Sequence, residues 1–588
     1  MSEFKRIFDI IHNYRDHFAK PIMVGGKKGD SWKTISTSEF IEDMDSISKA
    51  LIAKGVQKGD RIGLMSGNRP EWNMIDFASN QIGAAIVPFY PTLSPKDLAF
   101  IIKDSEVKIL FVSNNDLLVK IEEAIKDENL SVDLYTIDDI PNNTTLNDLI
   151  ALGRQQEIDL RPYNEAVDEE DLLTLIYTSG TTGTPKGVYL SHKNIISNVK
   201  GCQHLVPDDC KKSISFLPLS HIFERMVVYL YFSRGIQIWY AESLDNIVVD
   251  INEVKPQFFT TVPRVLEKVY DKIVAKGKSL TGVKKALFFW ALELGHQYQE
   301  PAKNSMWYNF RLGIARKLIF SKWKDALGGE VKFIISGGAA LQERLARVFW
   351  AANIRVLEGY GLTETSPVIS VNSMKDTGVK FGSVGKVLSN LDVKIAEDGE
   401  ILVKGPSISK GYYKNEKATA EVFDEQGFFH TGDIGELTSD GFLRITDRKK
   451  EMFKTAGGKY VAPQVMENKL MESPFIGQVM VIGENRRFPS ALIIPNFEDL
   501  EKWAKHKNIS FSSREELIGQ KEVLEKYDQI VDSAMTKFGK WEKVKKIELL
   551  PEEWTIDNGE LTPKLSLRRK VILEKNDKLI EKIYASEE

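Results

Sequence analysis

The first two thirds of the chain alternate short apolar runs with segments of helical periodicity. Apolar runs begin at Arg61, Lys108 and Leu172, and their length and content of branched side chains are typical of buried strands. Residues 39–51 place apolar side chains at the three- and four-residue spacing of an amphipathic helix. Strands that alternate with helices in this way predict parallel sheets covered by helices, so we expect an α/β fold.

The pattern changes at about Val384, where turn signals separate short alternating strands. Asp398-Gly399, residues 425–427 and Asp440-Gly441 have the composition of hairpin turns. The segment from about 384 to 449 is therefore predicted to form a β-rich subdomain.

After Lys449 the chain becomes strongly charged and its pattern changes again. It predicts a strand, a helix and two strands around residues 479–494, followed by helices and a Lys-rich tail. Hydrophobic cores stop growing at roughly 250 to 300 residues, so a chain of 588 residues needs more than one domain. We predict a large N-terminal domain, residues 1–449, hinged to a small α+β C-terminal domain, residues 450–588.

Composition and charge exclude several classes of protein. Lys and Arg number 79 against 83 Asp and Glu, which gives no electrostatic reason to expect a nucleic-acid partner. The two cysteines, Cys202 and Cys210, cannot build a disulfide framework and favour a reducing, cytoplasmic location. The sequence has neither a signal-peptide pattern nor an apolar stretch near the ~20 residues of a membrane span.

Two segments leave peripheral membrane contact open as an alternative. Near the start, helical spacing relates the apolar residues Phe4, Ile7, Phe8, Ile11 and Phe18. Residues 284–323 mix aromatic side chains with Lys and Arg at helical spacing, a composition that can seat a helix on a bilayer. For the first helix, and for most aromatic residues of the second segment, we favour packing within the domain.

The segment between the predicted strand at 171–177 and the predicted helix at 191–204, for which Ser191 is the candidate cap, has the features of a phosphate-binding loop. Its glycines let the backbone approach a ligand, its hydroxyls offer hydrogen bonds, and Lys186 supplies a positive charge. The candidate phosphate ligands are Thr178, Ser179, Gly180, Thr181, Thr182, Gly183, Thr184 and Lys186. Because Pro185 precedes the lysine and Gly187 follows it, the spacing is not that of a Walker loop.

Four further motifs follow in a recognisable order. They are LPLSHIFER at 217–225, GYGLTET at 359–365, HTGD at 430–433 and ITDRKKEMFKTAGGKYVAP at 445–463. With the loop, they resemble the motifs of the adenylate-forming (AMP-forming) acyl-CoA synthetase superfamily, and most of all its long-chain fatty-acid–CoA ligase branch. The resemblance implies an enzyme that uses ATP, Mg²⁺ and coenzyme A. It would convert a fatty acid and ATP into acyl-AMP and pyrophosphate, and then acyl-AMP and coenzyme A into acyl-CoA and AMP.

The resemblance implies roles for residues around the phosphates. Lys186 and residues 181–184 would hold the β- and γ-phosphates, and Thr363 would contact the α-phosphate. Glu364, together with Thr181, is the expected Mg²⁺ site, since this hard cation prefers oxygen ligands.

The resemblance also implies an adenosine site. Tyr360 and the backbone near Gly337 and Gly338 would enclose the adenine ring. Asp433 would accept hydrogen bonds from both ribose hydroxyls, because a carboxylate matches a diol, and Arg448 would support it.

Further residues would serve the acid and the second step. His221 has two interpretations that stay open: a satisfied pocket or core histidine, and a residue that orients the substrate carboxylate. Lys450 occupies the position at which the family pivots its small domain. Lys454 would belong to the thioester-forming face, and Gly457-Gly458 would let the backbone approach the pantetheine arm of coenzyme A.

The tail departs from the pattern of the family. In NGELTPKLSLRRK, Ser566 stands where the family has a lysine that reaches the carboxylate and the α-phosphate. Residues two apart share a face of an extended segment, so Lys564 is our candidate for this role, and we interpret Lys570 as part of a solvated basic tail. Two alternatives stay open: an acyl-AMP ligase that loads a carrier protein, and a catalytically weakened nucleotide- or lipid-binding protein.

Overall fold

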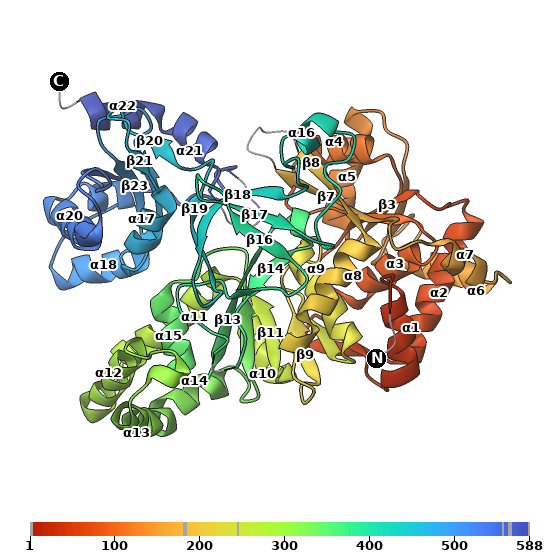
Figure 1. The fold of residues 1–588 in the computed structure, drawn as a ribbon, viewed down its shortest axis with the longest axis horizontal. Coiled ribbons are helices and arrows are strands. Elements are labelled where there is room, and N and C mark those ends of the chain that lie inside the picture. The colour runs from red at the N-terminus through yellow and green to blue at the C-terminus, as the bar shows by residue number, and fades with distance from the viewer. Residues whose placement is uncertain are drawn as a thin grey trace. The chain divides into compact units, whose positions relative to one another are not determined.

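The chain folds into two compact units (Figure 1). The computed structural model describes residues 4–179, 185–243, 246–375, 377–555, 558–561 and 567–585. The larger unit comprises the chain up to residue 394 together with 402–430 and 438–443, and the smaller unit comprises 395–401, 431–437 and the chain from 444 onward. Both units contain helices and strands, which confirms the expected α/β class with a large N-terminal part and a smaller C-terminal part.

The first sheet of the larger unit has six strands. Their order is β6 (Asp133–Thr136), β5 (Val107–Val112), β3 (Arg61–Met65), β4 (Ala85–Pro88), β7 (Leu172–Ser179) and β8 (Pro185–Ser191). Neighbouring strands run parallel except β7 and β8, which form an antiparallel hairpin. The apolar runs at Arg61, Lys108 and Leu172 are β3, β5 and β7, so these strand predictions are confirmed.

The second sheet of the larger unit has nine strands. Their order is β15 (Lys386–Val387), β14 (Val368–Val371), β13 (Arg355–Gly361), β12 (Phe333–Ser336), β11 (Phe258–Thr261), β9 (Lys212–Ser215), β10 (Gln237–Tyr240), β1 (Val24–Lys28) and β2 (Ser31–Ile35). The six strands from β13 to β1 run parallel, and the remaining three are antiparallel additions. The loops after the parallel strands therefore meet at one edge, where open α/β sheets bind ligands.

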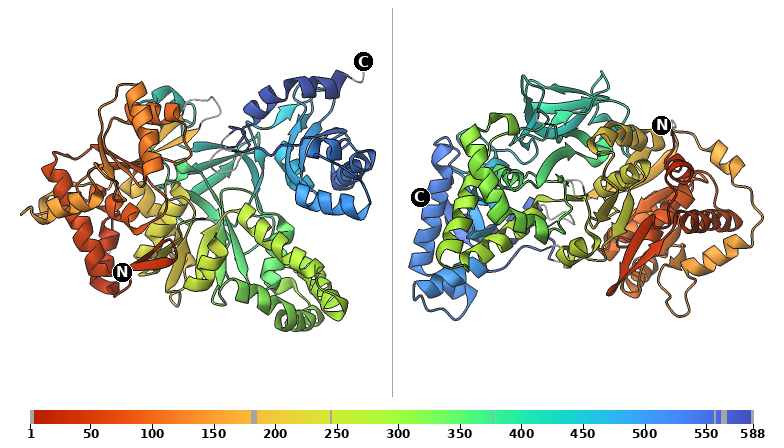
Figure 2. Two further views of the ribbon diagram at one scale, coloured as in Figure 1. Left: turned by 180° about the vertical axis from the view of Figure 1, so that it is seen from behind. Right: turned by 90° about the horizontal axis from the view of Figure 1, so that it is seen from below.

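Helices cover the sheets of the larger unit (Figure 2). They are α1 (Asp9–Phe18), α2 (Thr37–Ala53), α3 (Pro70–Asn80), α4 (Pro95–Ser105), α5 (Asn115–Asp127), α6 (Leu146–Arg154), α7 (Arg161–Ala166), α8 (His192–Cys202), α9 (Ile222–Ser233), α10 (Ile247–Val254), α11 (Pro263–Lys278), α12 (Gly282–His296), α13 (Met306–Ala315), α14 (Ser321–Ala326), α15 (Glu343–Ala351) and α16 (Glu416–Ala420). The predicted helix at 39–51 lies within α2, which begins with a capping box made by Ser36 and Glu39. Helices α3 and α9 are buried along nearly their whole length, so they lie between layers rather than on the surface.

The N-terminal helix packs on its own domain. Phe4, Ile7, Phe8 and Ile11 are buried, and the amide of Ile7 donates to Nδ1 of His192 at 3.1 Å. The packing interpretation is therefore confirmed, and a membrane contact through these side chains is excluded. Within the described ranges, no helix combines the length and apolarity needed to cross a bilayer.

The β-rich segment forms a sheet of four strands. Their order is β16 (Asp392–Ile395), β17 (Glu400–Lys404), β18 (Phe429–Leu437) and β19 (Leu443–Arg448). The predicted turns at Asp398-Gly399 and Asp440-Gly441 join β16 to β17 and β18 to β19, where Gly399 and Gly441 have φ values of 86° and 82°. These hairpin predictions are confirmed.

The smaller unit continues with two short sheets and has a hydrophobic core of its own. Strands β20 (Phe453–Lys454) and β21 (Tyr460–Val461) pair with each other, and β22 (Ile476–Ile482), β23 (Ser490–Pro495) and β24 (Lys546–Leu549) form a second sheet. The helices are α17 (Pro463–Leu470), α18 (Phe497–His506), α19 (Arg514–Ile518), α20 (Lys521–Ala534), α21 (Arg569–Lys575) and α22 (Asp577–Ala585). One cluster of buried side chains runs from Phe453 to Ile583. The sequence predicted one strand before α17, then α17, β22, β23 and later helices, but it missed the second strand of the β20–β21 pair and β24, whose four residues lie among lysines.

A buried ion pair joins the two helices between the layers. Arg225 on α9 and Asp76 on α3 are fully buried and bonded to each other. Nη1 of Arg225 also donates to Oγ1 of Thr174 on β7 at 2.7 Å, and Nε donates to Oη of Tyr229 at 2.7 Å. Oγ1 of Thr174 in turn donates to the carbonyl of Ile86 on β4 at 2.6 Å. The guanidinium therefore connects α9, which follows β9 of the second sheet, to β7 of the first sheet and, through Thr174, to β4.

Arg225→Met should destabilise the protein strongly, because it leaves Asp76 buried without its cation. Losing one partner of a buried pair costs about 3–5 kcal/mol, which urea unfolding followed by circular dichroism would measure. Arg161→Met is the matched control, since Arg161 pairs with Asp159 while 84% of its side chain stays exposed. That change should cost less than about 1 kcal/mol, and equal losses in the two variants would contradict a special role for the buried pair.

Candidate functional site

The hairpin of β7 and β8 holds both ends of the predicted phosphate loop. Thr178 pairs with Lys186 and Ser179 with Pro185, so the last described residues before the loop face the first ones after it. Gly180, Thr181, Thr182, Gly183 and Thr184 lie outside the described residues. The helix predicted after the loop is α8, and its predicted cap is confirmed, because Ser191 accepts from the amide of Asn194 in a capping box.

Tyr412 links the phosphate-loop lysine to the predicted magnesium ligand. Nζ of Lys186 lies 5.1 Å from the centre of the Tyr412 ring, and the Tyr412 hydroxyl donates to Oε1 of Glu364 at 2.9 Å. Burial raises the pKa of Tyr412 above its ordinary value, and the Glu364 carboxylate raises it further, so the hydroxyl stays a donor at neutral pH. Backbone contacts fix this arrangement, since Tyr412 bridges to Val188 on β8 and the amide of Ser409 donates to the carbonyl of Glu364 at 2.8 Å.

Sequence reasoning missed Tyr412. It is far from both contact partners in the chain, so no periodic pattern connects them. The available signal was local: two tyrosines directly after Gly411, a glycine with a φ of 115°.

Glu364 and Thr363 sit on a tight turn after β13. They belong to a 3₁₀ turn, Thr363–Thr365, whose start is closed by a hydrogen bond from the amide of Leu362 to Oγ1 of Thr365 at 3.0 Å. Thr363 is buried and Glu364 is half-buried, so the carboxylate lies at the surface of the turn. Tyr360, which lies three residues before Thr363 near the end of β13, is also half-buried.

The predicted adenine and acid residues lie at the same edge of the sheet as Glu364. Gly337 and Gly338 directly follow β12, the neighbour of β13, and the amide of Gly337 donates to the carbonyl of Thr261 at the end of β11 at 3.2 Å. A Cβ atom added to Gly337 would lie 3.0 Å from the ring of Phe223 on α9. The loop after β12 therefore lies against the first turn of α9, which His221 caps.

The contacts of His221 define its tautomer. Its Nδ1 accepts a hydrogen bond from the amide of Phe223 at 3.0 Å, so the neutral ring carries its proton on Nε2. The histidine is half-buried. It caps α9 through Nδ1, and its Nε2 is the hydrogen-bond donor of the ring. Both interpretations of His221 are compatible with this geometry.

Two buried carboxyl groups near this edge were not predicted. Glu224, three residues after His221 in the first turn of α9, accepts a hydrogen bond from Oγ1 of Thr260, and burial raises its pKa to about 7. Glu358 on β13 is also buried, and burial raises its pKa to about 8. Both groups therefore hold a proton more readily than an ordinary glutamate.

The smaller unit brings Asp433 and Arg448 together. Nε of Arg448 lies 3.4 Å from Oδ1 of Asp433, which is buried on β18, while Arg448 is half exposed at the end of β19. Next to them, the amide of Gly432 donates to Oε1 of Glu400 at 2.9 Å, and Nζ of Lys449 pairs with the other oxygen of Glu400 at 2.7 Å. Arg448 thus contacts Asp433 directly, and the Glu400–Lys449 pair fixes the backbone of the preceding residue.

The predicted hinge and thioester residues lie on exposed turns of the smaller unit. Lys450 is exposed in the turn after β19, three residues after the buried Asp447. Lys454 is exposed on β20, with Nζ 4.6 Å from the centre of the Tyr460 ring. Gly458 has a φ of 73°, which closes the β20–β21 hairpin, and nothing lies within 4 Å of a Cβ built there.

In the tail, the structure describes residues 558–561 and 567–585, on both sides of the predicted catalytic lysine. Leu561 and Leu567 pair across residues 562–566, and the amide of Arg568 donates to the carbonyl of Glu560 at 2.7 Å. Lys564 and Ser566 lie outside the described residues. Lys570 is 84% exposed on α21 beside Glu574, as expected for a solvated basic tail.

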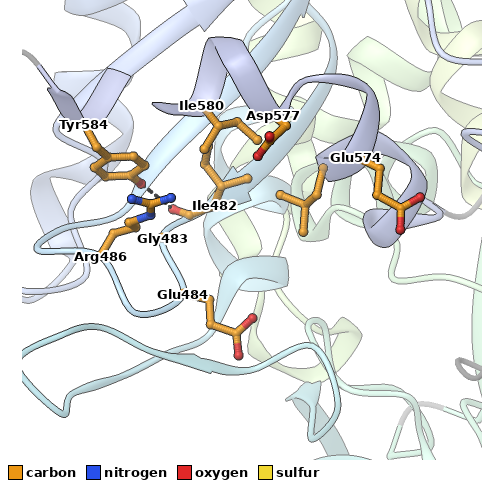
Figure 3. A pocket seen from close by; sticks show the side chains of 9 residues that line it. Ile482, Gly483, Glu484, Arg486, Glu574, Asp577, Ile580 and Tyr584 are labelled. Carbon is orange, nitrogen blue, oxygen red and sulfur yellow. Dashed lines mark hydrogen bonds between the residues drawn. The ribbon is translucent and has the colours of Figure 1, made fainter. Parts of the chain in front are cut away.

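A cavity in the smaller unit holds none of the predicted site residues. Figure 3 shows its walls, where Arg486 lies against the ring of Tyr584 and Asp577 and Glu574 come from the C-terminal helices. Its volume is about 420 Å³. This cavity is therefore not part of the predicted nucleotide and acid site.

Gly361→Ala should disrupt the turn that carries Glu364. A Cβ atom at this position would lie 1.8 Å from the carbonyl oxygen of Pro367, so the backbone must move. We expect a loss of about 1–3 kcal/mol in urea unfolding. Gly359→Ala is the matched control, because its nearest contact is Val371 at 3.5 Å, an ordinary van der Waals distance. A neutral result for Gly361→Ala would show that the turn is not tightly constrained.

Comparison with known proteins supports the resemblance seen in the motifs. Residues 12–413 match the AMP-binding enzyme family, and residues 451–588 match the AMP-binding enzyme C-terminal domain. The chain is 34% identical to the long-chain-fatty-acid–CoA ligase FadD15 of Mycobacterium bovis, over 95% of this chain and 93% of that protein. It is 32% identical to the human long-chain-fatty-acid–CoA ligase 1, over 93% of this chain and 82% of that protein.

Solved structures share the fold at lower sequence identity. The adenylation domain of a carboxylate reductase from Mycobacterium chelonae superimposes with a TM-score of 0.79 at 21% identity, covering 99% of this chain and 91% of that one. The anthranilate CoA ligase AuaEII in complex with anthranoyl-AMP gives a TM-score of 0.72 at 18% identity, covering 100% and 98%. The motifs, the fold and the near full-length alignments agree, and the chain belongs to the AMP-binding enzyme family.

Proposed function

We propose that this chain is an ATP-dependent long-chain fatty acid–CoA ligase. In the first step a carboxylate oxygen of the fatty acid attacks the α-phosphorus of ATP, and the bond to pyrophosphate breaks. In the second step the sulfur of coenzyme A attacks the acyl carbon, the thiol proton is released, and AMP leaves. The relatives named long-chain-fatty-acid–CoA ligases, which align with nearly the whole chain, support this assignment.

The observation that carries the proposal is the contact chain from Lys186 through Tyr412 to Glu364. It puts a cation over an aromatic ring and a carboxylate at the hydroxyl of the same ring, beside the hairpin that bears the phosphate loop. Adenylation brings a carboxylate to an anionic phosphate, so charge must be neutralised as it builds. Lys186 supplies one cation for the β- and γ-phosphates, together with Thr178, Ser179 and residues 180–184.

Glu364 fits a magnesium ion. Its carboxylate is half-buried on a turn fixed by backbone hydrogen bonds, and Mg²⁺ favours one or two carboxylates together with substrate phosphates. Bound there with ATP and with Thr181, the ion would withdraw charge from the phosphates. Tyr412 holds Oε1 of Glu364 through its hydroxyl. We assign Thr363, the residue before Glu364, to the α-phosphate.

Asp433 and Arg448 are assigned to the ribose. Arg448 pairs with Asp433, whose carboxylate offers acceptors for the two hydroxyls of a diol. We assign the adenine to Tyr360 and the loop of Gly337 and Gly338, which lie at neighbouring strand ends.

His221 is assigned to the substrate carboxylate. Its protonated Nε2 is a donor, whereas Nδ1 is occupied by the amide of Phe223, so the ring can hold a carboxylate oxygen without becoming charged. Lys450 is assigned to the pivot between the two steps, and Lys454 with Gly457 and Gly458 to the coenzyme A side. The exposed positions of these residues on short turns support the assignment.

The test of this function is fatty-acid-dependent exchange of pyrophosphate into ATP, followed by detection of the thioester. We expect exchange to increase from short to long saturated acids and coenzyme A to be acylated. Exchange with acyl transfer only to a carrier protein would favour the carrier-loading alternative. ATP binding without acid-dependent exchange would favour a weakened binding protein, and either result would overturn the proposal.

Lys564→Ala should impair adenylate formation. A cation that stabilises the transition state contributes enough that its loss slows the step by about 100-fold or more, which pyrophosphate exchange would measure. Thioester formation from supplied acyl-adenylate should be retained. Lys570→Ala is the matched control, because Lys570 is exposed beside Glu574, and it should behave like the wild type. Normal exchange in Lys564→Ala would refute the assignment.

A further inference from the structure

Helix α13 and the turn after it present an apolar stripe to solvent. The stripe consists of Met306, Trp307, Phe310, Ile314 and Leu318, whose exposed fractions are 91, 68, 61, 40 and 45%. The last four recur at three- and four-residue spacing, so they share one face of α13 and of the π-helical turn Arg316–Phe320. The rings of Trp307 and Phe310 stack with centroids 5.6 Å apart.

The exposure of this face is unusual for the chain. Among the described residues, the four most exposed large apolar side chains are Met306, Val283, Trp307 and Phe310. Val283 lies at the start of α12, which packs on α13. Figure 2 shows both helices at the periphery of the larger unit.

The opposite face of the helix is firmly attached to the protein. Leu312 and Ala315 are buried, and the hydroxyl of Tyr308 donates to the carbonyl of Leu294 on α12 at 2.6 Å. Nε of Arg316 donates to the carbonyl of Ala351 on α15 at 2.8 Å. The rotation of the helix is thus fixed, and the stripe is a second apolar face rather than a core face turned outward.

Most aromatic residues of this segment pack within the domain, as the sequence predicted, since Tyr298 is buried and Phe289, Trp290 and Tyr308 are half-buried. Phe288, Phe320 and Trp323 are buried in the core, as expected. Trp307 and Phe310 are not, because the core lies on the other side of their helix.

The charge of the segment differs from that of the whole protein. Residues 282–325 contain eight Lys and Arg against three Asp and Glu, a net charge of +5, whereas the chain carries −4. Lys317 and Lys322 are exposed on either side of Leu318, the last residue of the stripe, and Lys284 and Lys285 are exposed beside Val283 in the sequence. The apolar stripe is therefore bordered by cations.

We propose that α13 docks on the surface of a lipid bilayer that carries anionic headgroups. Trp and Phe side chains favour the boundary between headgroups and acyl chains, and flanking lysines pair with lipid phosphates. The stripe extends over about 18 Å at ~1.5 Å per residue, so the helix would lie in the plane of the membrane. A second copy of this chain is a poorer occupant, since it would bring two segments of like charge together.

Vesicle sedimentation with the full-length protein tests the proposal. We expect the wild type to bind vesicles of phosphatidylcholine with 30% phosphatidylglycerol more tightly than pure phosphatidylcholine, with the difference lost in 0.5 M salt. Trp307→Gln/Phe310→Gln should weaken binding to both compositions at least 10-fold. Lys317→Gln/Lys322→Gln should weaken binding to the anionic vesicles alone.

The matched control is Trp541→Gln/Val119→Gln, which removes exposed apolar side chains outside the stripe. Trp541 and Val119 are 51% and 55% exposed, and this variant should bind vesicles like the wild type. Equal binding by the stripe variant and the wild type would overturn the proposal. A stripe variant that loses a dimer in analytical ultracentrifugation without changing vesicle binding would assign the face to a second copy.

The docking surface and the proposed ligase function can fail separately. Pyrophosphate exchange with the fatty acid delivered from cyclodextrin, without vesicles, reports on the site alone. The stripe variant should keep that exchange while it loses vesicle binding. If the wild type itself shows no exchange, the proposed function is refuted, whereas the docking surface is still tested by sedimentation.

Discussion

The guanidinium of Arg225 is the constraint on which the larger unit depends. A charge in a buried layer is tolerated only if each of its donors finds an acceptor, and the acceptors here come from α3, α9 and β7. Apolar packing alone would let α3 and α9 slide, whereas a directional hydrogen-bonded pair permits one arrangement. Since His221 caps α9 and β7 leads into the phosphate loop, this arrangement also sets where two parts of the site begin.

The site itself is built from pieces that are remote in the sequence. Neighbouring parallel strands bring Gly337 and Glu364 to one edge, and the return of the chain at Tyr412 connects that edge to the hairpin of β7 and β8. The cation and the carboxylate do not touch each other directly. Each contacts the same tyrosine, the lysine over its ring and the glutamate at its hydroxyl.

Sequence reasoning located the regular elements and the motif residues because their signals are local. Apolar runs identified β3, β5 and β7, and Ser191 was correctly identified as a helix cap. It missed β24, because a four-residue strand between lysines has too few positions for alternation to be visible. It could not distinguish Phe8, which is buried, from Trp307, which is exposed, since both belong to segments with apolar residues at helical spacing and only the tertiary fold decides which face meets the core.

The separate hydrophobic core of the smaller unit has a consequence for how damage spreads. Its buried cluster is built entirely from residues between 453 and 583, so its cohesion does not draw on side chains of the larger unit. Such a module can lose its packing while the β7–β8 hairpin and its surroundings persist, which leaves a chain that is half native. Selection on the two parts can therefore proceed at different rates, and one module can be replaced during evolution without rebuilding the other.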